Sequence, residues 1–307
     1  MIKTPPYLKK GDTIGITCPA GYMAIAKAQA CIETLQNWGF DVMVGKTLGS
    51  KSKNYFSAPD EDRRDELQAM LDDENINAIL CGRGGYGVSR IIDGLDFTKF
   101  KKKPKWIIGF SDITVLHAHL YTKIKVASLH APMAAAFNDG PQGSAKENEF
   151  IKSLHKALIG KKAKYSCAAH PFNKKGNVTA ELVGGNLSLL VHLTGTPSDI
   201  KTTNKILFIE DIGEHIYNID RMLYQMKRSG KLSNLAGLIV GGFTDMLDTE
   251  RPFGKKVYKL IKEITAAYDY PLCFGFPVSH EKENYALKIG CTYTLKVGKP
   301  KVVLSEQ

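Results

Sequence analysis

The chain has 307 residues, of which 43% are hydrophobic and 24% are charged, and this balance excludes a wholly disordered protein. A chain of this length exceeds one comfortable hydrophobic core, so we expect two domains. The formal net charge of +11 suggests an anionic partner, but the lysines and arginines are scattered along the chain. Because no basic stripe is interleaved with aromatic residues, nucleic acid is disfavoured, and the charge fits attraction of a small carboxylate-bearing substrate.

The first half of the chain alternates short β-type runs with helical patterns. We expect helices over residues 24–38, from Asp60 onward and after Ser111, and strands at Thr13–Thr17, Asp41–Val44, Ala78–Cys81 and Trp106–Ile108. Strands that alternate with helices predict an α/β domain over residues 1–160, with a parallel sheet covered on both faces. Such sheets bind ligands at the loops that leave the carboxyl ends of their strands.

The alternation lapses over residues 161–177, where Gly, Lys, Asn and Pro accumulate, and we interpret this segment as a linker. A second, smaller β/α domain is predicted over residues 178–307. Its expected helices lie near residues 216–226 and 257–267, and its expected strands are Val178–Leu182, Ile206–Ile209, Leu238–Val240, Tyr293–Val297 and Lys301–Leu304.

Neither end-of-chain signals nor cysteine spacing indicate secretion or a metal. The N-terminus is too polar and too rich in proline for a signal peptide. The longest apolar stretch, Leu235–Phe243, has about half the length that spans a bilayer. The six cysteines are far apart, without a Cys-x-x-Cys pair, and no histidines have metal-ligand spacing. We therefore expect a cytoplasmic protein with reduced cysteines that binds neither metal nor membrane.

The segment Ile107–Thr114, Ile-Ile-Gly-Phe-Ser-Asp-Ile-Thr, runs from a buried strand into a helix. A serine on such a turn has its hydroxyl held out at the top of the sheet, and the next backbone N–H can donate to an oxyanion. Ser111 is therefore a candidate nucleophile. Only the first half of the Gly-x-Ser-x-Gly motif is present, because Ile113 replaces the second glycine. The alternative is that Ser111 only caps the following helix.

A glycine-rich loop, Arg83-Gly84-Gly85-Tyr86-Gly87, follows the expected third strand and opens another helix. Its glycines free backbone N–H groups to approach an anion, either a phosphate or an oxyanion. The loop is neither a Walker motif nor a dinucleotide-binding fingerprint. The alternative is a tight turn between strand and helix.

Two further segments place ionisable residues at strand ends. Glu210 and Asp211 follow an apolar strand, where a carboxylate needs a partner such as a histidine, although a plain surface strand end is the alternative. His280 follows the run Leu272–Phe276 and can act as a general base and then an acid, unless it is merely solvated. The order serine, acid, histidine is that of α/β-hydrolases. Because these residues are divided between the two predicted domains, we expect the site in the cleft between them.

Taken together, these motifs resemble the LD-carboxypeptidase family, serine peptidases that include the muramoyltetrapeptide carboxypeptidases. The resemblance covers essentially the whole chain. It is carried by segments in the family's order: Gly11–Ile16 with Pro19-Ala20, Phe56–Arg63, Arg83–Gly87, Ile108–Thr114, Leu182–Leu187, Glu210–Glu214, Asp220–Leu223 and Gly275–His280.

The resemblance implies a catalytic triad of Ser111, Glu210 and His280, with Glu210 as the acid in preference to Asp211 or Glu214. It implies an oxyanion hole formed by the N–H groups of Asp112 and Gly85. It also implies a flavodoxin-like first domain, a smaller β/α second domain and a homodimer, without metal or cofactor. The substrate's terminal carboxylate calls for a cation near the site, and Arg83 is the positional candidate.

The activity implied by the resemblance is removal of the terminal D-alanine from the L-diamino acid of a cytoplasmic murein tetrapeptide, a step of cell-wall recycling. One alternative is a related branch that hydrolyses peptide–nucleotide antibiotics such as microcin C and has extra length in the second domain. The interval from Ser111 to Glu210 lacks an obvious insertion, which favours recycling. A non-enzymatic alternative is a small-molecule-binding α/β protein whose glycine loop holds an anion. Lysine and diaminopimelate both stay open as the diamino acid.

Overall fold

The computed structural model describes residues 2–138 and 148–307. The chain divides into two compact units: unit 1 comprises Met1–Lys161 and Tyr285–Ile289, and unit 2 comprises Lys162–Asn284 and Gly290–Gln307. Across these described ranges, no helix combines the length and the apolar character that crossing a bilayer requires.

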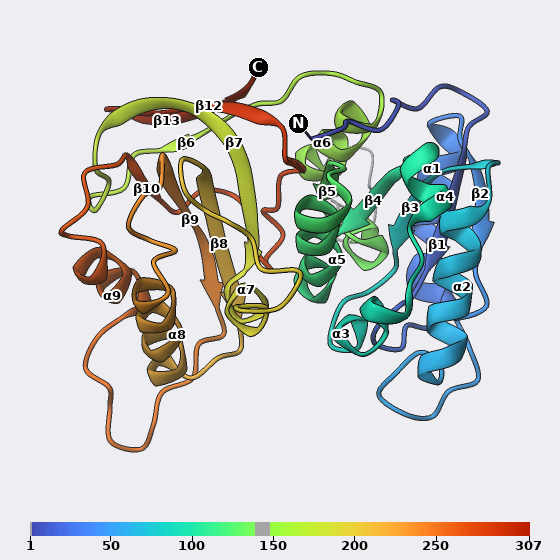
Figure 1. The fold of residues 1–307 in the computed structure, drawn as a ribbon, viewed down its shortest axis with the longest axis horizontal. Coiled ribbons are helices and arrows are strands. Elements are labelled where there is room, and N and C mark those ends of the chain that lie inside the picture. The colour runs from blue at the N-terminus through green and yellow to red at the C-terminus, as the bar shows by residue number, and fades with distance from the viewer. Residues whose placement is uncertain (1, 139–147) are drawn as a thin grey trace. The chain divides into compact units, whose positions relative to one another are not determined.

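Unit 1 is built on a mainly parallel sheet with the strand order β11-β5-β4-β3-β1-β2 (Figure 1). Its parallel strands are β1 (Thr13–Thr17), β2 (Asp41–Val44), β3 (Ile76–Cys81), β4 (Trp106–Gly109) and β5 (Ser128–His130), and β11 (Leu287–Ile289) pairs antiparallel with β5. Read from β2 to β5, the order 2-1-3-4-5 is that of flavodoxin-like sheets. The predicted flavodoxin-like fold of the first domain is therefore confirmed.

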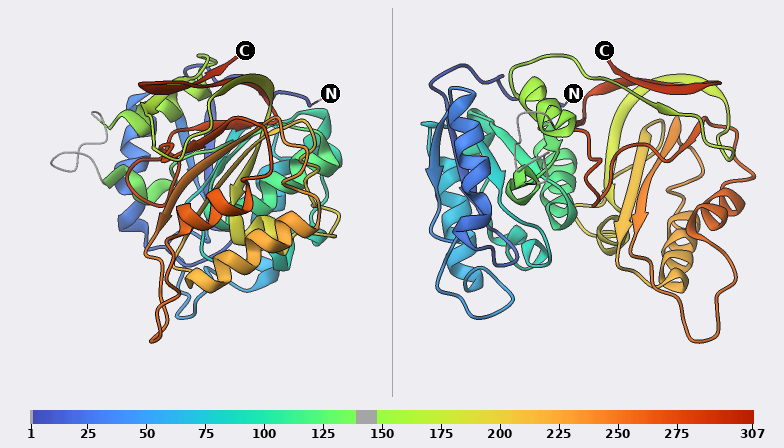
Figure 2. Two further views of the ribbon diagram at one scale, coloured as in Figure 1. Left: turned by 90° about the vertical axis from the view of Figure 1, so that its left-hand side faces the viewer. Right: turned by 180° about the vertical axis from the view of Figure 1, so that it is seen from behind.

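Helices and short turns connect the strands of unit 1. They are η1 (Ile25–Ala28), α1 (Gln29–Asn37), α2 (Asp60–Asp72), α3 (Val88–Ile91), η2 (Ile92–Gly94), α4 (Thr98–Lys102), η3 (Ser111–Ile113), α5 (Thr114–His119), η4 (Leu120–Ile124), η5 (Ala134–Asn138) and α6 (Glu149–Leu158). α2 lies in front of the sheet in Figure 1, and α1 lies in front of it in the rear view of Figure 2. Because helices cover both faces, β4 is buried along its whole length, as its unbroken apolar sequence predicts.

Unit 2 contains a sheet with the order β10-β9-β8-β7-β12-β13-β6. Its strands are β6 (Lys164–Ala168), β7 (Gly176–Asn186), β8 (Ile206–Ile212), β9 (Gly237–Thr244), β10 (Leu272–Phe274), β12 (Thr292–Val297) and β13 (Lys301–Glu306). The long strand β7 pairs antiparallel with β12 through its first half and parallel with β8 through its second half. It therefore joins an antiparallel and a parallel part, and Figure 1 shows it curving between them.

Helices of unit 2 follow its parallel strands, as in any βα unit. They are α7 (Leu187–His192), α8 (Ile216–Arg228) and α9 (Val257–Ile264), and each turns apolar side chains toward the core. The predicted closing strands near the C-terminus correspond to β12 and β13. The mixed sheet with α8 and α9 agrees with the predicted β/α second domain.

Two short strands depart from the predicted division of the chain. The segment predicted as a linker, residues 161–177, contains β6, which pairs with β13 inside the sheet of unit 2. The residues of β6 are alternately exposed and half-buried, so the strand carries little hydrophobic signal. Near the other end of the chain, β11 joins the sheet of unit 1, although residues 178–307 were all predicted to belong to the second domain. A three-residue strand is too short for its pattern to show which sheet it will join.

Candidate active site

The turn that carries Ser111 has an unusual backbone. β4 ends at Gly109, and Ser111 follows with a φ of 62°, in the left-handed region that residues other than glycine rarely adopt. A Cβ on Gly109 would lie 2.9 Å from Cγ1 of Ile113 and 3.2 Å from Cβ of Cys81, so only glycine fits there. The N-cap of the following turn η3 is Phe110 rather than Ser111. Ser111 therefore lies on a sharp strand-to-helix turn, and helix capping does not explain it.

A buried histidine, His117, forms hydrogen bonds beside this turn. His117 on α5 places Nε2 2.9 Å from the carbonyl oxygen of Gly109 and Nδ1 2.9 Å from Oγ of Ser128. Complete burial lowers the pKa of His117 to about 4, so the ring is neutral near pH 7. Since a carbonyl can only accept, Nε2 carries the proton and donates to Gly109, and the Ser128 hydroxyl donates to Nδ1. His117 thus anchors the end of β4 immediately before the turn that carries Ser111.

The glycine-rich loop passes directly against Ser111. A Cβ on Gly84 would lie 2.8 Å from Cβ of Ser111 and 3.3 Å from the backbone nitrogen of Asp112. Gly85 has a φ of 96°, which favours glycine. Within the part of the chain that the structure describes, the N–H groups of Gly85 and Asp112 donate no hydrogen bond. Unit 1 therefore brings together Ser111, Asp112 and the glycine loop, the residue set expected for a nucleophile with its oxyanion hole.

Arg83 opens this loop with an exposed side chain. Its Nη1 donates a hydrogen bond of 2.7 Å to the backbone carbonyl of Tyr22. The contact holds one edge of the guanidinium in place beside the loop. A role for Arg83 in binding a substrate carboxylate stays a prediction.

Unit 2 pairs Glu210 with His280. Glu210 lies on β8 with a completely buried side chain, and its Oε2 is 2.6 Å from Nδ1 of His280. Burial by itself lowers the pKa of His280, but the hydrogen bond and the charge of Glu210 outweigh it and raise the pKa above its ordinary value. Nδ1–H donates to the carboxylate, so Nε2 is the basic nitrogen of the neutral ring. Such a pair is suited to a general base.

Two glycines of β9 make room for the loop that carries His280. A Cβ on Gly241 would overlap the carbonyl oxygen of Val278 and lie 3.2 Å from Cβ of Glu210. Gly242 donates its N–H to the same carbonyl at 2.9 Å. Ser279 completes the loop, because its Oγ accepts the N–H of Glu281 at 3.0 Å. The close approach of this loop to β9 places His280 against Glu210.

The neighbouring acids have other partners. Asp211 accepts the N–H of Ser188 at 2.9 Å and the side-chain amide of Asn186 at 2.8 Å, at the start of α7. Burial, followed by the charge of Glu210, raises the pKa of Asp211 to about 6. Glu214 accepts from the side-chain amide of Asn218 at 3.2 Å. Of the three acids considered from the sequence, Glu210 is thus the one that pairs with His280.

Comparison with known proteins shows the family to which the chain belongs. Residues 14–131 match the model of the LD-carboxypeptidase N-terminal domain, and residues 179–295 match that of the LD-carboxypeptidase C-terminal domain. The chain belongs to the LD-carboxypeptidase family. The "Probable murein peptide carboxypeptidase" of Bacillus subtilis is 33% identical over 303 residues, which cover 98% of this chain and 93% of that protein.

Two further family relatives bear on fold and specificity. The crystal structure of muramoyltetrapeptide carboxypeptidase from Oxalobacter formigenes superimposes with a TM-score of 0.84 at 26% identity, covering 96% of this chain and 98% of that one. The microcin C7 self-immunity protein MccF of Escherichia coli is 27% identical over 345 residues, covering 100% of this chain and 98% of that protein.

Several residues that build the candidate site of this LD-carboxypeptidase family member had no distinct role in the sequence analysis. His117 was only one of the histidines without metal-ligand spacing, and Gly241 and Gly242 lay within the apolar stretch Leu235–Phe243, just after the predicted strand Leu238–Val240. Two adjacent glycines inside an apolar strand were a usable signal, because glycine there often marks a close approach of backbone. The contact of His117 with Gly109 had no signal in the sequence, because it depends on the packing of α5 against β4.

Proposed function

We propose that this member of the LD-carboxypeptidase family is a serine carboxypeptidase that hydrolyses the bond between an L-diamino acid and D-alanine in murein tetrapeptide. The observation that carries the proposal is the Glu210–His280 hydrogen bond of 2.6 Å, a carboxylate–imidazole pair of the kind that activates a hydroxyl nucleophile. The left-handed conformation of Ser111 supports it from the other unit. The names of the relatives support the murein peptide as the substrate.

In the proposed mechanism, Nε2 of His280 removes the proton from Oγ of Ser111 as that oxygen attacks the carbonyl carbon. Glu210 holds the ring by its Nδ1–H and stabilises the imidazolium that forms. The mechanism requires Ser111 and His280 to come within hydrogen-bond distance in the enzyme–substrate complex. The raised pKa of His280 matches a base that must also return its proton.

Breakdown of the tetrahedral intermediate completes the proposed cycle. The N–H groups of Asp112 and Gly85 are proposed to bind the oxyanion. The imidazolium of His280 then protonates the departing amine of D-alanine, and the acyl chain stays on Ser111. Water, deprotonated by His280, attacks the ester and regenerates the free serine. Arg83 is proposed to attract the terminal carboxylate of the substrate.

Hydrolysis of a peptide–nucleotide is the competing activity within the family. The alignment with MccF extends over 345 positions although this chain has 307 residues, so MccF contains insertions that this chain lacks. The alignment with the Bacillus subtilis relative needs 303 positions for 98% of this chain. This difference favours the murein peptide. A non-catalytic anion-binding role would not explain the partly buried hydrogen bond between Glu210 and His280.

Two other features of the proposal concern the protein's setting. We infer a cytoplasmic location, because the family resemblance implies a murein peptide that is recovered in the cytoplasm. We also infer a homodimer, which follows from the family resemblance. Fractionation of cells and sedimentation of the purified protein test these two inferences directly.

The decisive experiment combines a cleavage assay on candidate substrates with covalent labelling of the proposed nucleophile. The purified protein is incubated with murein tetrapeptides that contain either lysine or diaminopimelate, and with an aminoacyl-nucleotide, and products are identified by mass spectrometry. We expect release of D-alanine from a tetrapeptide and no cleavage of the aminoacyl-nucleotide. A fluorophosphonate reagent should modify Ser111, as located on a tryptic peptide. Cleavage of the nucleotide alone would assign the competing activity, and absence of both cleavage and labelling would reject an enzyme.

A further inference from the structure

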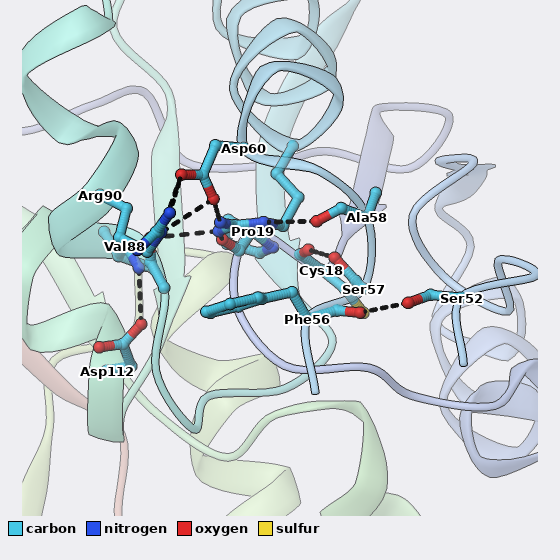
Figure 3. Close-up of polar contacts among 12 residues, drawn as sticks. Cys18, Pro19, Ser52, Phe56, Ser57, Ala58, Asp60, Val88, Arg90 and Asp112 are labelled. Atoms are coloured by element: carbon cyan, nitrogen blue, oxygen red, sulfur yellow. Dashed lines mark hydrogen bonds and ion pairs between the residues drawn. The ribbon is translucent and has the colours of Figure 1, made fainter. Parts of the chain in front are cut away.

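The guanidinium of Arg63 is completely buried in unit 1, although the proposed mechanism does not use it. It lies in the first turn of α2. Its Nε donates to the carbonyl of Ala58 at 3.0 Å, its Nη1 donates to the carbonyl of Pro19, and its Nη2 pairs with Asp60. Figure 3 shows these contacts converging from Pro19, Ala58 and Asp60. Burying a guanidinium costs free energy unless its N–H groups find acceptors. The surrounding carbonyl and carboxylate oxygens supply them here.

Arg63 also holds the end of the glycine-rich loop. Its Nη1 donates a second hydrogen bond, of 3.1 Å, to the carbonyl of Gly87. A Cβ on Gly87 would lie 2.7 Å from that Nη1 and 3.1 Å from Cα of Ala20, and its φ is 149°. At the other side of the loop, Gly84 accepts the N–H of Gly21 at 3.0 Å. The loop is therefore fixed at Gly84 and at Gly87, on either side of Gly85.

The side chain of Asp112 joins this loop to the nucleophile turn. Its carboxylate is completely buried, and Oδ2 accepts the N–H of Val88 at 2.8 Å, at the start of α3 (Figure 3). Arg90 on α3 in turn pairs with Asp60 at 2.7 Å, and Asp60 also pairs with Arg63. A connected set of contacts thus runs from Arg63 through the loop end to the residue next to Ser111.

We propose that Arg63 is a positioning residue for the oxyanion hole, and that it acts together with the Asp112 carboxylate. Arg63 fixes Gly87, Asp112 fixes Val88, and between them the loop keeps the N–H of Gly85 beside the N–H of Asp112. The guanidinium reaches four acceptors, on Ala58, Pro19, Gly87 and Asp60, from three separate nitrogens. A lysine ammonium has only three donors, all on one nitrogen, and cannot reproduce this set. The inference rests on the proposed function, and it assigns the Phe56–Arg63 motif a part in catalysis.

The test compares Arg63→Lys with Arg64→Lys on the full-length protein. Arg64 is the adjacent arginine of α2, and its side chain pairs with Asp65 at the surface. For Arg63→Lys we expect kcat to fall about 10- to 100-fold while KM changes about twofold or less, because a displaced oxyanion donor weakens only the transition state. Arg64→Lys should keep both constants. A tetrahedral phosphonate analogue of the substrate should lose affinity in proportion to the loss of kcat.

A second pair of variants covers the case in which Arg63→Lys does not fold, as judged by circular dichroism. Asp112→Ala removes the acceptor for the N–H of Val88, and Asp112→Asn retains an acceptor oxygen. We expect Asp112→Ala to lose kcat about tenfold or more and Asp112→Asn to restore most of it, with KM nearly constant in both. Folded Arg63→Lys or Asp112→Ala protein with wild-type kcat would overturn the inference. Activity that survives in Ser111→Ala would instead overturn the proposed function.

Discussion

The two units prepare their parts of the proposed site by different means. In unit 1, Ser111 is positioned by the backbone: a left-handed φ of 62°, a glycine before it, and a glycine loop packed against it. In unit 2, the close approach of the His280 loop to β9 brings His280 against Glu210, and one partly buried side-chain hydrogen bond of 2.6 Å joins them. The position of Ser111 depends on backbone conformation and close packing, whereas the Glu210–His280 pair depends on charge and protonation.

This difference determines how each unit should respond to change. A backbone-built site is sensitive to an added methyl group, because a Cβ on Gly84 would lie 2.8 Å from Cβ of Ser111. A site built on a charged pair is sensitive to pH and to neutralisation of one partner, because burial and hydrogen bonding compete in setting the pKa of His280. Four tests, each with a control variant, probe this contrast and are given from the largest expected effect to the smallest.

Ser111→Ala removes the proposed nucleophile and should have the largest effect. We expect kcat for D-alanine release to fall by roughly four to six orders of magnitude, as happens when a catalytic serine is lost. Steady-state assays with murein tetrapeptide measure the loss, and circular dichroism checks the fold. Ser233→Ala, at an exposed serine of unit 2, is the control and should keep wild-type activity. Residual activity within about tenfold of wild type would exclude Ser111 as the nucleophile.

Glu210→Gln tests the charged pair of unit 2. We expect kcat to fall about 10³- to 10⁴-fold, because the ring loses the group that orients and stabilises its charged form. In wild type, kcat/KM should rise with pH as His280 loses its proton, at an apparent pKa above the ordinary value of 6.5. Without the negative charge of Glu210, burial dominates and lowers the pKa of His280. The acidic limb of the residual activity should therefore move to lower pH.

Asp211→Asn is the matched control for that experiment. It removes the neighbouring buried carboxylate, whose contacts are with Asn186 and Ser188, and leaves the Glu210–His280 hydrogen bond in place. The charge of Asp211 is the last of the influences on His280, so the acidic limb should move less than in Glu210→Gln. An equal displacement in both variants, or none in Glu210→Gln, would contradict a specific role for Glu210.

Gly84→Ala tests the backbone-built site of unit 1. The new Cβ would lie 2.8 Å from Cβ of Ser111, so the loop and the nucleophile must separate. We expect kcat to fall about 10- to 100-fold, with an unchanged pH profile, because a small displacement of the reacting groups is costly. Gly298→Ala is the control, since its nearest neighbour, the carbonyl of Lys301, would be at an ordinary 3.4 Å. If the acidic limb of the pH profile shifted in Gly84→Ala, the glycine loop would also affect the protonation of His280, and the contrast between the two units would fail.

The smallest effect concerns stability rather than rate. At a φ of 62°, Ser111→Gly should be more stable than Ser111→Ala by about 0.5–1 kcal/mol, because glycine adopts the left-handed region without steric penalty. Chemical denaturation of the two inactive variants measures the difference in free energy of unfolding. The same pair of substitutions at Ser233, which has no positive φ, should show the opposite order. Equal stabilities at Ser111 would show that the turn is not strained.

Much of the architecture was readable from residue patterns. The strands Thr13–Thr17 and Asp41–Val44 have the predicted bounds, and the expected strands near residues 78, 106, 206 and 238 all occur with small extensions. Hydrophobic runs bounded by glycine, proline and polar turn residues were enough to place these strands, because buried parallel strands are apolar along their length. The short or half-exposed strands β6 and β11 carry no such signal, and this is why the linker and the domain boundary differ from the prediction.

For the site, the sequence by itself determined which residues are candidates. Ser111, Glu210 and His280 each follow or end an apolar run, and their order, with the family motifs, singled them out. The family resemblance favoured Glu210 over Asp211 as the acid, and the tertiary structure gives the physical reason: Glu210 pairs with His280, whereas Asp211 accepts the N–H of Ser188. The tertiary structure also revealed the contacts from which roles for Arg63, His117 and Gly84 are inferred. Those roles consist of contacts between segments distant in the chain, and such contacts exist only once the sheet has brought the segments together.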